Sequence, residues 1–250
     1  MKLLLAGGAA AALCSFFVEA PQTESAAGAV SVQVNWDGEI PDALAPLSID
    51  RQKSAGCCAD DAAVDATDRT RRISAEGGVA DVIFTFAPKG HEVEVEPREE
   101  PILLDQRECR FEPHVLPVLE GETVRYQNSD AVNHNVNVRA RKNGSFNRNV
   151  PAGDHHDVEL TEAERITIAC DIHPWMNATV VVTDAPYFGT TGLDGSLSIE
   201  GLAPGNYEVE WWHETLGKGK LDDITVTEGG TVEIEHEVKA SSGGGRRRRR

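Results

Sequence analysis

The apolar residues of this chain alternate with polar ones over short stretches, a pattern that predicts strands rather than helices. Residues 30–36, 134–138 and 165–170 each place every second side chain on one apolar face. Residues 79–86 form an apolar run of strand length, and long helical periodicity is absent from the sequence. The pattern therefore predicts an all-β fold. Residues 45–76 are poor in large apolar side chains, so we expect a surface excursion with at most one helical turn.

One short loop concentrates unusual chemistry. Residues 170–176 read Cys-Asp-Ile-His-Pro-Trp-Met, and Met176 is the only methionine besides Met1. Strand alternation points Cys170 inward, together with Ile166 and Ile168.

A histidine that could complete this donor set lies upstream. His134 shares a face with Val136 and Val138 at the start of an alternating run, so its ring is expected at the buried end of a strand. Inward donors at adjoining strand ends can meet at one pole of a sandwich. A cysteine, two histidines and a weak axial methionine describe a type 1 (blue) copper centre for electron transfer.

The two stretches together resemble the cupredoxins, and most closely the amicyanin-type and plastocyanin-like members, over residues 80–184. The resemblance implies a Greek-key sandwich. It also implies that one copper ion is held by His134, Cys170, His173 and Met176, and that Asn135 braces the two ligand loops. Zinc is the alternative metal, since cysteine and histidine bind it too. Methionine is a poor zinc ligand, which favours copper.

Residues 185–239 resemble a second family, the carboxypeptidase regulatory-like (transthyretin-like) modules. Asp194-Gly195 and Pro204-Gly205 are strong turn signals between alternating strands, as the small Ig-like sandwich of that family requires. Modules of this kind are noncatalytic, so the resemblance implies a scaffold or docking role. The segment is short, and we expect it to pack on the copper domain to complete its core.

The ends of the chain differ from its centre. Residues 1–29 read as a signal peptide, with Lys2 ahead of an apolar stretch too short to predict stable membrane insertion. Residues 240–250 form a flexible basic tail. Between them we expect an N-terminal strand and excursion at 30–76, the cupredoxin domain at 77–184 and the regulatory-like module at 185–239. The predicted location is extracytoplasmic, either periplasmic or secreted.

Three cysteines remain when Cys14 of the leader and the ligand Cys170 are set aside. An oxidising compartment favours one disulfide, which we expect to join Cys109 to Cys57 or Cys58. A vicinal bridge between Cys57 and Cys58 is the strained alternative, and sequence alone does not choose. That vicinal pair lacks histidines nearby in the sequence, which argues against a second metal site.

The overall charge narrows the choice of partner. The formal net charge of -17 disfavours nucleic acid and anionic membranes, and it would steer a basic redox protein such as a c-type cytochrome toward the chain. Pro174 and Trp175, beside His173, are expected at the surface as a docking patch. The sequence thus predicts an exported one-electron carrier and not an enzyme. The alternatives are a copper-handling protein that does not cycle and an extracytoplasmic β-sandwich interaction module.

Overall fold

The computed structural model describes residues 26–58 and 63–240. It is all-β over these residues, with seventeen strands, as the alternation predicts. None of the described residues belongs to a helix that is long and apolar enough to cross a membrane. Most of the predicted leader, and the basic tail from residue 241, lie outside the described residues. The boundary drawn at residue 29 falls inside β1, which begins at Gly28.

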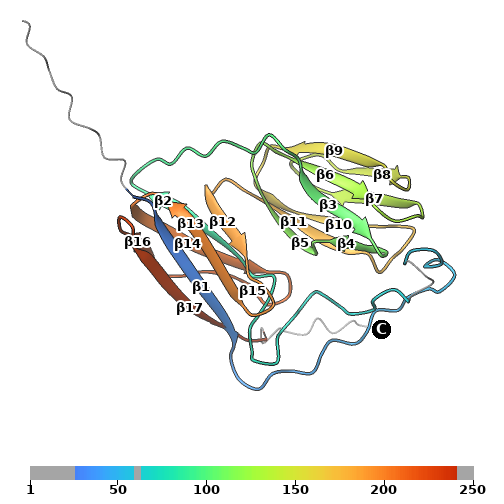
Figure 1. Cartoon of the computed structure of the whole chain (residues 1–250), viewed down its shortest axis with the longest axis horizontal. Helices are drawn as coiled ribbons and strands as arrows, with labels where there is room; N and C mark the ends of the chain where they lie inside the picture. The colour runs from blue at the N-terminus through green and yellow to red at the C-terminus, as the bar shows by residue number, and fades with distance from the viewer. Residues whose placement is uncertain (1–25, 59–62, 241–250) are drawn as a thin grey trace, which may run out of the picture.

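Two β-sandwiches lie side by side in the molecule (Figure 1). Each consists of two sheets. In the first sandwich one sheet has the order β5-β11-β10-β7-β8 and the other β4-β3-β6-β9. Its strands are β3 Ile102–Arg107, β4 Arg110–Glu112, β5 Val115–Leu119, β6 Glu122–Asn128, β7 His134–Arg139, β8 Phe146–Val150, β9 His155–Leu160, β10 Glu164–Ala169 and β11 Asn177–Thr183.

The second sandwich joins the N-terminal strands to the C-terminal ones. One sheet has the order β13-β1-β17, and the other has the order β12-β2-β14-β15 with β16 paired to β14. Its strands are β1 Gly28–Trp36, β2 Ile83–Lys89, β12 Tyr187–Thr190, β13 Ser196–Leu202, β14 Gly205–His213, β15 Gly217–Lys220, β16 Ile224–Val226 and β17 Thr231–Val238.

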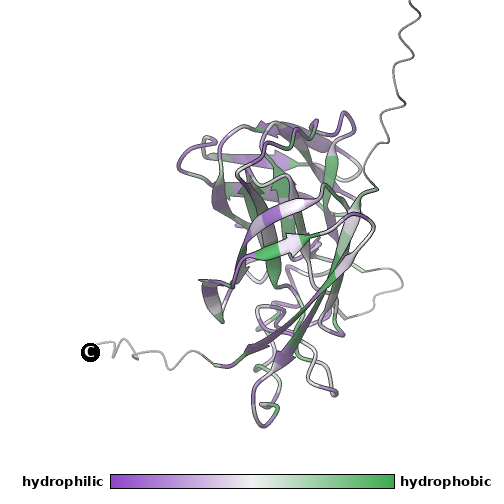
Figure 2. Ribbon diagram, turned by 90° about the vertical axis from the view of Figure 1, so that its left-hand side faces the viewer, coloured by the Kyte–Doolittle hydropathy of each residue, from purple (hydrophilic) through white to green (hydrophobic). Residues whose placement is uncertain are grey.

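Each sandwich has a core of its own. Leu104, Tyr126 and Ile166 are fully buried in the first, and Val32 and Phe84 are buried in the second. Hydrophobic residues accordingly run along the central strands, as the colouring of Figure 2 shows. Burial of apolar side chains supplies about 25 cal/mol per Å² of apolar surface, so each core can stabilise its own pair of sheets.

The strand pairing differs from the predicted division at residues 77 and 185. β1 lies between β13 and β17, and β2 pairs with both β12 and β14. Residues 83–89 therefore belong with the C-terminal strands and not with the first sandwich. The physical reason is that the C-terminal strands need β1 and β2 to cover their apolar faces, a pairing between distant segments that local alternation does not reveal.

The two sandwiches also contact each other through side chains. Trp212 packs against a small cluster of Ile83, Val115 and Val181, which come from both sandwiches. His114 of the first sandwich lies 2.7 Å from the Glu214 carboxylate of the second. These contacts fix the orientation of the end of the first sandwich that carries the β5 and β11 strands.

In its described parts, residues 45–58 and 63–76, the excursion has no strand beyond an isolated bridge at Ile73. It runs from the second sandwich to the far end of the first (Figure 1). Arg110 anchors it by donating to the Thr67 carbonyl at 2.7 Å. A disulfide joins Cys57 to Cys109, which confirms the predicted bridge and selects Cys57 as the partner. Cys58 is free and partly exposed.

Candidate metal centre

Three of the predicted ligands meet at one end of the first sandwich. His134 is the first residue of β7, Cys170 follows the last residue of β10, and these strands are neighbours in one sheet. His173 comes from the loop between β10 and β11. One donor atom from each of the three lies within 4.8 Å of the other two. All three side chains are buried, with at most 2% of their surface exposed.

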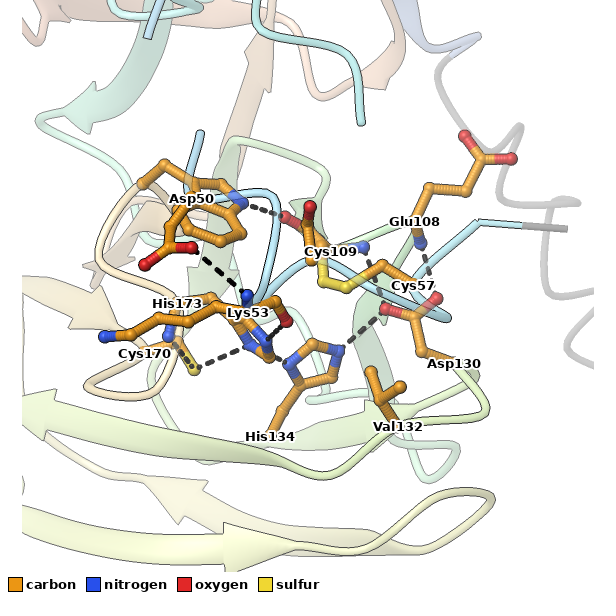
Figure 3. The surroundings of a disulfide bond; sticks show 12 residues. Asp50, Lys53, Cys57, Glu108, Cys109, Asp130, Val132, His134, Cys170 and His173 are labelled. Carbon is orange, nitrogen blue, oxygen red and sulfur yellow. Dashed lines mark hydrogen bonds and ion pairs between the residues drawn. A yellow bond between two sulfur atoms is a disulfide. The ribbon is translucent and has the colours of Figure 1, made fainter. Parts of the chain in front are cut away.

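The hydrogen bonds of the two imidazole rings determine which nitrogen faces inward. His134 Nε2 donates to Asp130 Oδ2 at 2.7 Å, and His173 Nε2 donates to the Lys53 carbonyl at 2.9 Å (Figure 3). With both outer nitrogens acting as donors, a neutral ring presents the lone pair of Nδ1 to the centre. The two Nδ1 atoms are 2.8 Å apart, and Cys170 Sγ lies 3.7 Å from that of His173.

The ligand loop is tightly closed by its own backbone. Met176 N donates to the His173 carbonyl at 2.9 Å, and Cys170 N donates to the Met176 carbonyl at 3.2 Å. Met176 thus returns beside Cys170 just before β11 begins at Asn177, and its side chain is 1% exposed. The short spacing from Cys170 to Met176 is what permits this closure.

Asn135 connects the β7 end to the ligand loop. Its Oδ1 accepts hydrogen bonds from the backbone N–H groups of Asp171 at 2.8 Å and Ile172 at 3.2 Å. Its Nδ2 donates to Asn147 Oδ1 at 2.6 Å. Asn135 therefore hydrogen-bonds the loop that carries Cys170 and His173 to the start of β7.

The electrostatics of the centre favour a thiolate at Cys170. Burial alone would raise the pKa of the thiol, but its contacts with the His134 and His173 rings and with backbone groups at Asn135 and His173 outweigh it and lower the pKa to about 6. Burial would likewise lower the pKa of His134, yet the neighbouring Asp130 and Cys170 raise it above its ordinary value. A thiolate is the form that binds metal, so the pocket prepares Cys170 for that role.

Asp130 is the residue that the sequence analysis missed. It is 7% exposed, and besides His134 it accepts hydrogen bonds from the backbone N–H groups of Glu108 at 2.6 Å and Cys109 at 2.8 Å. A carboxylate on the outer nitrogen of a metal-binding histidine fixes the ring and increases its basicity. The only sign of it in the sequence is an aspartate four residues before His134. That aspartate lies in a loop, where the alternation of residues does not tell which way its side chain points.

Replacement of Asp130 by asparagine should lower both the pKa of His134 and the metal affinity of the centre. The negative charge that holds the outer nitrogen is lost, and changes of this kind typically cost about 10–100-fold in affinity. An NMR titration of the metal-free protein measures the pKa, and competition with a chelator measures the affinity. Asp157→Asn, which removes an exposed carboxylate paired with Arg125, is the control. An Asp130 variant with the same pKa and affinity as its parent would contradict the assignment.

The expected docking patch is wrong in part. Pro174 is exposed, but His173 is 2% exposed and Trp175 is 7% exposed. The Trp175 indole donates to the Cys109 carbonyl at 3.1 Å. The reason is the excursion, which covers this edge of the loop and places the Lys53 carbonyl on the outer nitrogen of His173 (Figure 3). A segment without periodicity gives no sign in the sequence of where it will pack.

No protein-family model matches the sequence, and no curated protein does. Among solved structures, a reduced mutant of amicyanin is 30% identical, with a TM-score of 0.32, over 35% of this chain and 87% of its own. A purple cupredoxin from Nitrosopumilus maritimus is 26% identical, with a TM-score of 0.27, over 30% and 83% of the two chains. A copper-containing nitrite reductase from Thermus scotoductus is 22% identical, with a TM-score of 0.32, over 38% of this chain and only 25% of its own.

Proposed function

We propose that this chain is a type 1 copper protein that carries single electrons between redox partners. The observation that supports it most directly is the convergence of His134 Nδ1, His173 Nδ1 and Cys170 Sγ in one buried pocket. The donor set fits copper, because a thiolate with two imidazoles selects soft or borderline metals over magnesium and calcium. Met176 would supply the weak axial ligand.

The residues around the donors are suited to electron transfer. When bound, copper would supply a one-electron couple. The chain holds the donors in one arrangement through Asn135 and the backbone bonds of the ligand loop, so that little movement accompanies a change of charge. The four side chains His134, Cys170, His173 and Met176 are each at most 2% exposed, so they are shielded from bulk solvent and offer little surface to a substrate. A carrier is therefore preferred to an enzyme.

The partner in this proposal is a basic redox protein such as a c-type cytochrome. The net charge of -17 would attract it over distances of about one Debye length, roughly 8–10 Å at physiological salt. The route to the surface would run through the hydrogen bond from His173 to Lys53 and through exposed Pro174, because Trp175 is buried. The disulfide supports an extracytoplasmic location, since such bonds persist in oxidising compartments.

A copper-handling protein that does not cycle is the second candidate. The observation that favours it is that the excursion covers His173, so a partner could not contact this ring directly. An electron carrier and a copper-storage protein differ in the rate at which the bound copper exchanges electrons with a partner.

Cyclic voltammetry of the copper-loaded protein tests the proposal. A carrier is expected to give a reversible one-electron wave and rapid reduction by a cytochrome in stopped-flow measurements. Zinc-loaded protein, which has no redox couple in this range, is the control. Slow electron exchange combined with tight retention of Cu(I) would favour the store, and failure to retain copper after dialysis would refute both.

A further inference from the structure

The Cys57–Cys109 disulfide lies directly beside the proposed copper centre. Both of its sulfur atoms and one ring nitrogen of His173 fall within 4.8 Å of one another. Cys57 is 4% exposed, Cys109 is 0% exposed and His173 is 2% exposed. Figure 3 shows the disulfide above the two imidazole rings, on the side from which the excursion arrives. Two sulfurs and an imidazole nitrogen are thus gathered in a second buried group.

The disulfide segment contacts both histidine ligands of the centre. Cys109 N donates to Asp130, which in turn accepts from His134. On the other side, Lys53 lies four residues before Cys57, and its carbonyl accepts a hydrogen bond from His173. The Cys57–Cys109 bond is therefore linked to the His134 ring by two successive hydrogen bonds through Asp130, and to the His173 ring through the Lys53 carbonyl on the same segment as Cys57.

The turn that carries Cys109 is held in a costly conformation. Glu108 and Cys109 join β3 to β4 with φ values of 53° and 55°, where glycine and asparagine are usual. For other residues such a left-handed conformation is strained. Asp130 offsets this cost by accepting both backbone N–H groups. Glycine or asparagine would form this hairpin turn with less strain than Cys109 does. The cysteine at this position places its sulfur beside His173.

We propose that Cys57, Cys109 and His173 form a second metal site, one for Cu(I), when the disulfide is reduced. Two thiolates and one imidazole are a soft donor set that suits monovalent copper. The site competes with the electron-transfer centre for His173, because a neutral imidazole that donates through Nε2 has only the Nδ1 lone pair to offer. It rests on the proposed function only in taking copper as its metal. It would give the chain a place to receive or release the ion directly beside that centre.

The step balances with a dithiol as reductant. A thiolate of the dithiol attacks one sulfur of the disulfide, its second thiol releases the mixed disulfide, and two electrons and two protons pass to Cys57 and Cys109. Each cysteine then loses its proton on binding Cu(I). The reverse exchange with the oxidised, disulfide form of the dithiol returns two electrons and two protons to it, re-forms the Cys57–Cys109 bond and removes both thiolate donors, so the second site exists only in the reduced protein.

Of the two cysteines, Cys57 is the one whose backbone can move to let the sulfurs separate around an ion. Cys57 is on the excursion, where residues 51–58 form turns and bends without a strand. Cys109 is on a turn fixed by Asp130, so the movement falls to Cys57. The neighbouring Cys58 is free, partly exposed and outside the sulfur and nitrogen group, and burial together with Glu108 and Asp130 raises its pKa. It provides a matched control one residue away.

Competition for Cu(I) with a chromophoric chelator tests the second site. One sample keeps its disulfide, with ascorbate present to hold copper as Cu(I). The other is reduced with a phosphine and desalted without oxygen. The reduced protein is expected to retain Cu(I) at chelator concentrations at least tenfold higher, and X-ray absorption of that sample should show additional copper–sulfur bonds. Cys57→Ser and Cys109→Ser should abolish this gain, whereas Cys58→Ser should keep it.

Several outcomes would overturn the proposal. Equal retention by the two samples would do so, as would an undiminished gain in the Cys57 and Cys109 variants. Loss of the β-sheet circular dichroism signal on reduction of the wild-type chain would also do so, because the site requires the folded sandwich. The visible absorption of the Cu(II) protein with its disulfide intact reports the first centre separately, so failure of the proposed function is distinguishable from failure of the second site.

Discussion

Replacement of Cys170 by serine is expected to abolish the intense visible absorption of the copper-loaded protein. The band of a type 1 centre depends on a thiolate bound to copper, and serine has no sulfur to provide it. The structure strengthens this expectation, because Cys170 Sγ faces His173 Nδ1 at 3.7 Å and its pKa is lowered to about 6. The absorption spectrum after addition of Cu(II) and dialysis gives the result directly.

Cys58→Ser is the matched control for this experiment. Cys58 and Cys170 are the two free cysteines among the described residues, but only Cys170 is fully buried with the histidines. The Cys58 variant should therefore keep the full absorption. A band that persists in the Cys170 variant would show that another sulfur binds the metal, and Cys57 and Cys109 would be the residues to examine.

Local patterns predicted the interior of the first sandwich well. Alternation at Ile166, Ile168 and Cys170 places these side chains on the buried face of β10, and all three are buried. His134 is likewise 0% exposed at the start of β7. A period of two residues fixes which face a side chain takes, so a strand that ends at a pole delivers its last inward residue to that pole.

The pairing of strands distant in the sequence and the packing of the excursion over His173 could not be predicted in the same way. Nothing in the sequence of residues 45–76 indicates that the Lys53 carbonyl will accept a hydrogen bond from His173. The sequence around Asp130 likewise does not indicate that its carboxylate will point to His134. The pairing of β2 with β14 depends on segments more than a hundred residues apart. Such contacts are decided by which apolar faces remain uncovered, a property of the assembled sheets and not of a short window of sequence.

Phe84→Ala is expected to reduce the free energy of unfolding of the second sandwich by about 3–5 kcal/mol, the usual cost of removing a buried phenylalanine. Phe84 is 0% exposed on β2. Its ring stacks on Phe86 at a centroid distance of 6.5 Å and meets the edge of His236 on β17 at 6.2 Å. The side chain thus joins both sheets of this sandwich. Denaturant unfolding followed by tryptophan fluorescence measures the loss.

Leu193→Ala is the control, because Leu193 is 55% exposed in the same sandwich and should change stability by no more than about 0.5 kcal/mol. The visible absorption of bound copper should persist at denaturant concentrations that unfold the Phe84 variant's second sandwich, since the metal ligands belong to the other core. A loss below about 1 kcal/mol would contradict the role assigned to Phe84 in joining the two sheets. It would weaken the argument that residues 185–239 need β2 to complete their core, and would favour the self-contained module that the turn signals at Asp194 and Pro204 suggest when they are considered alone.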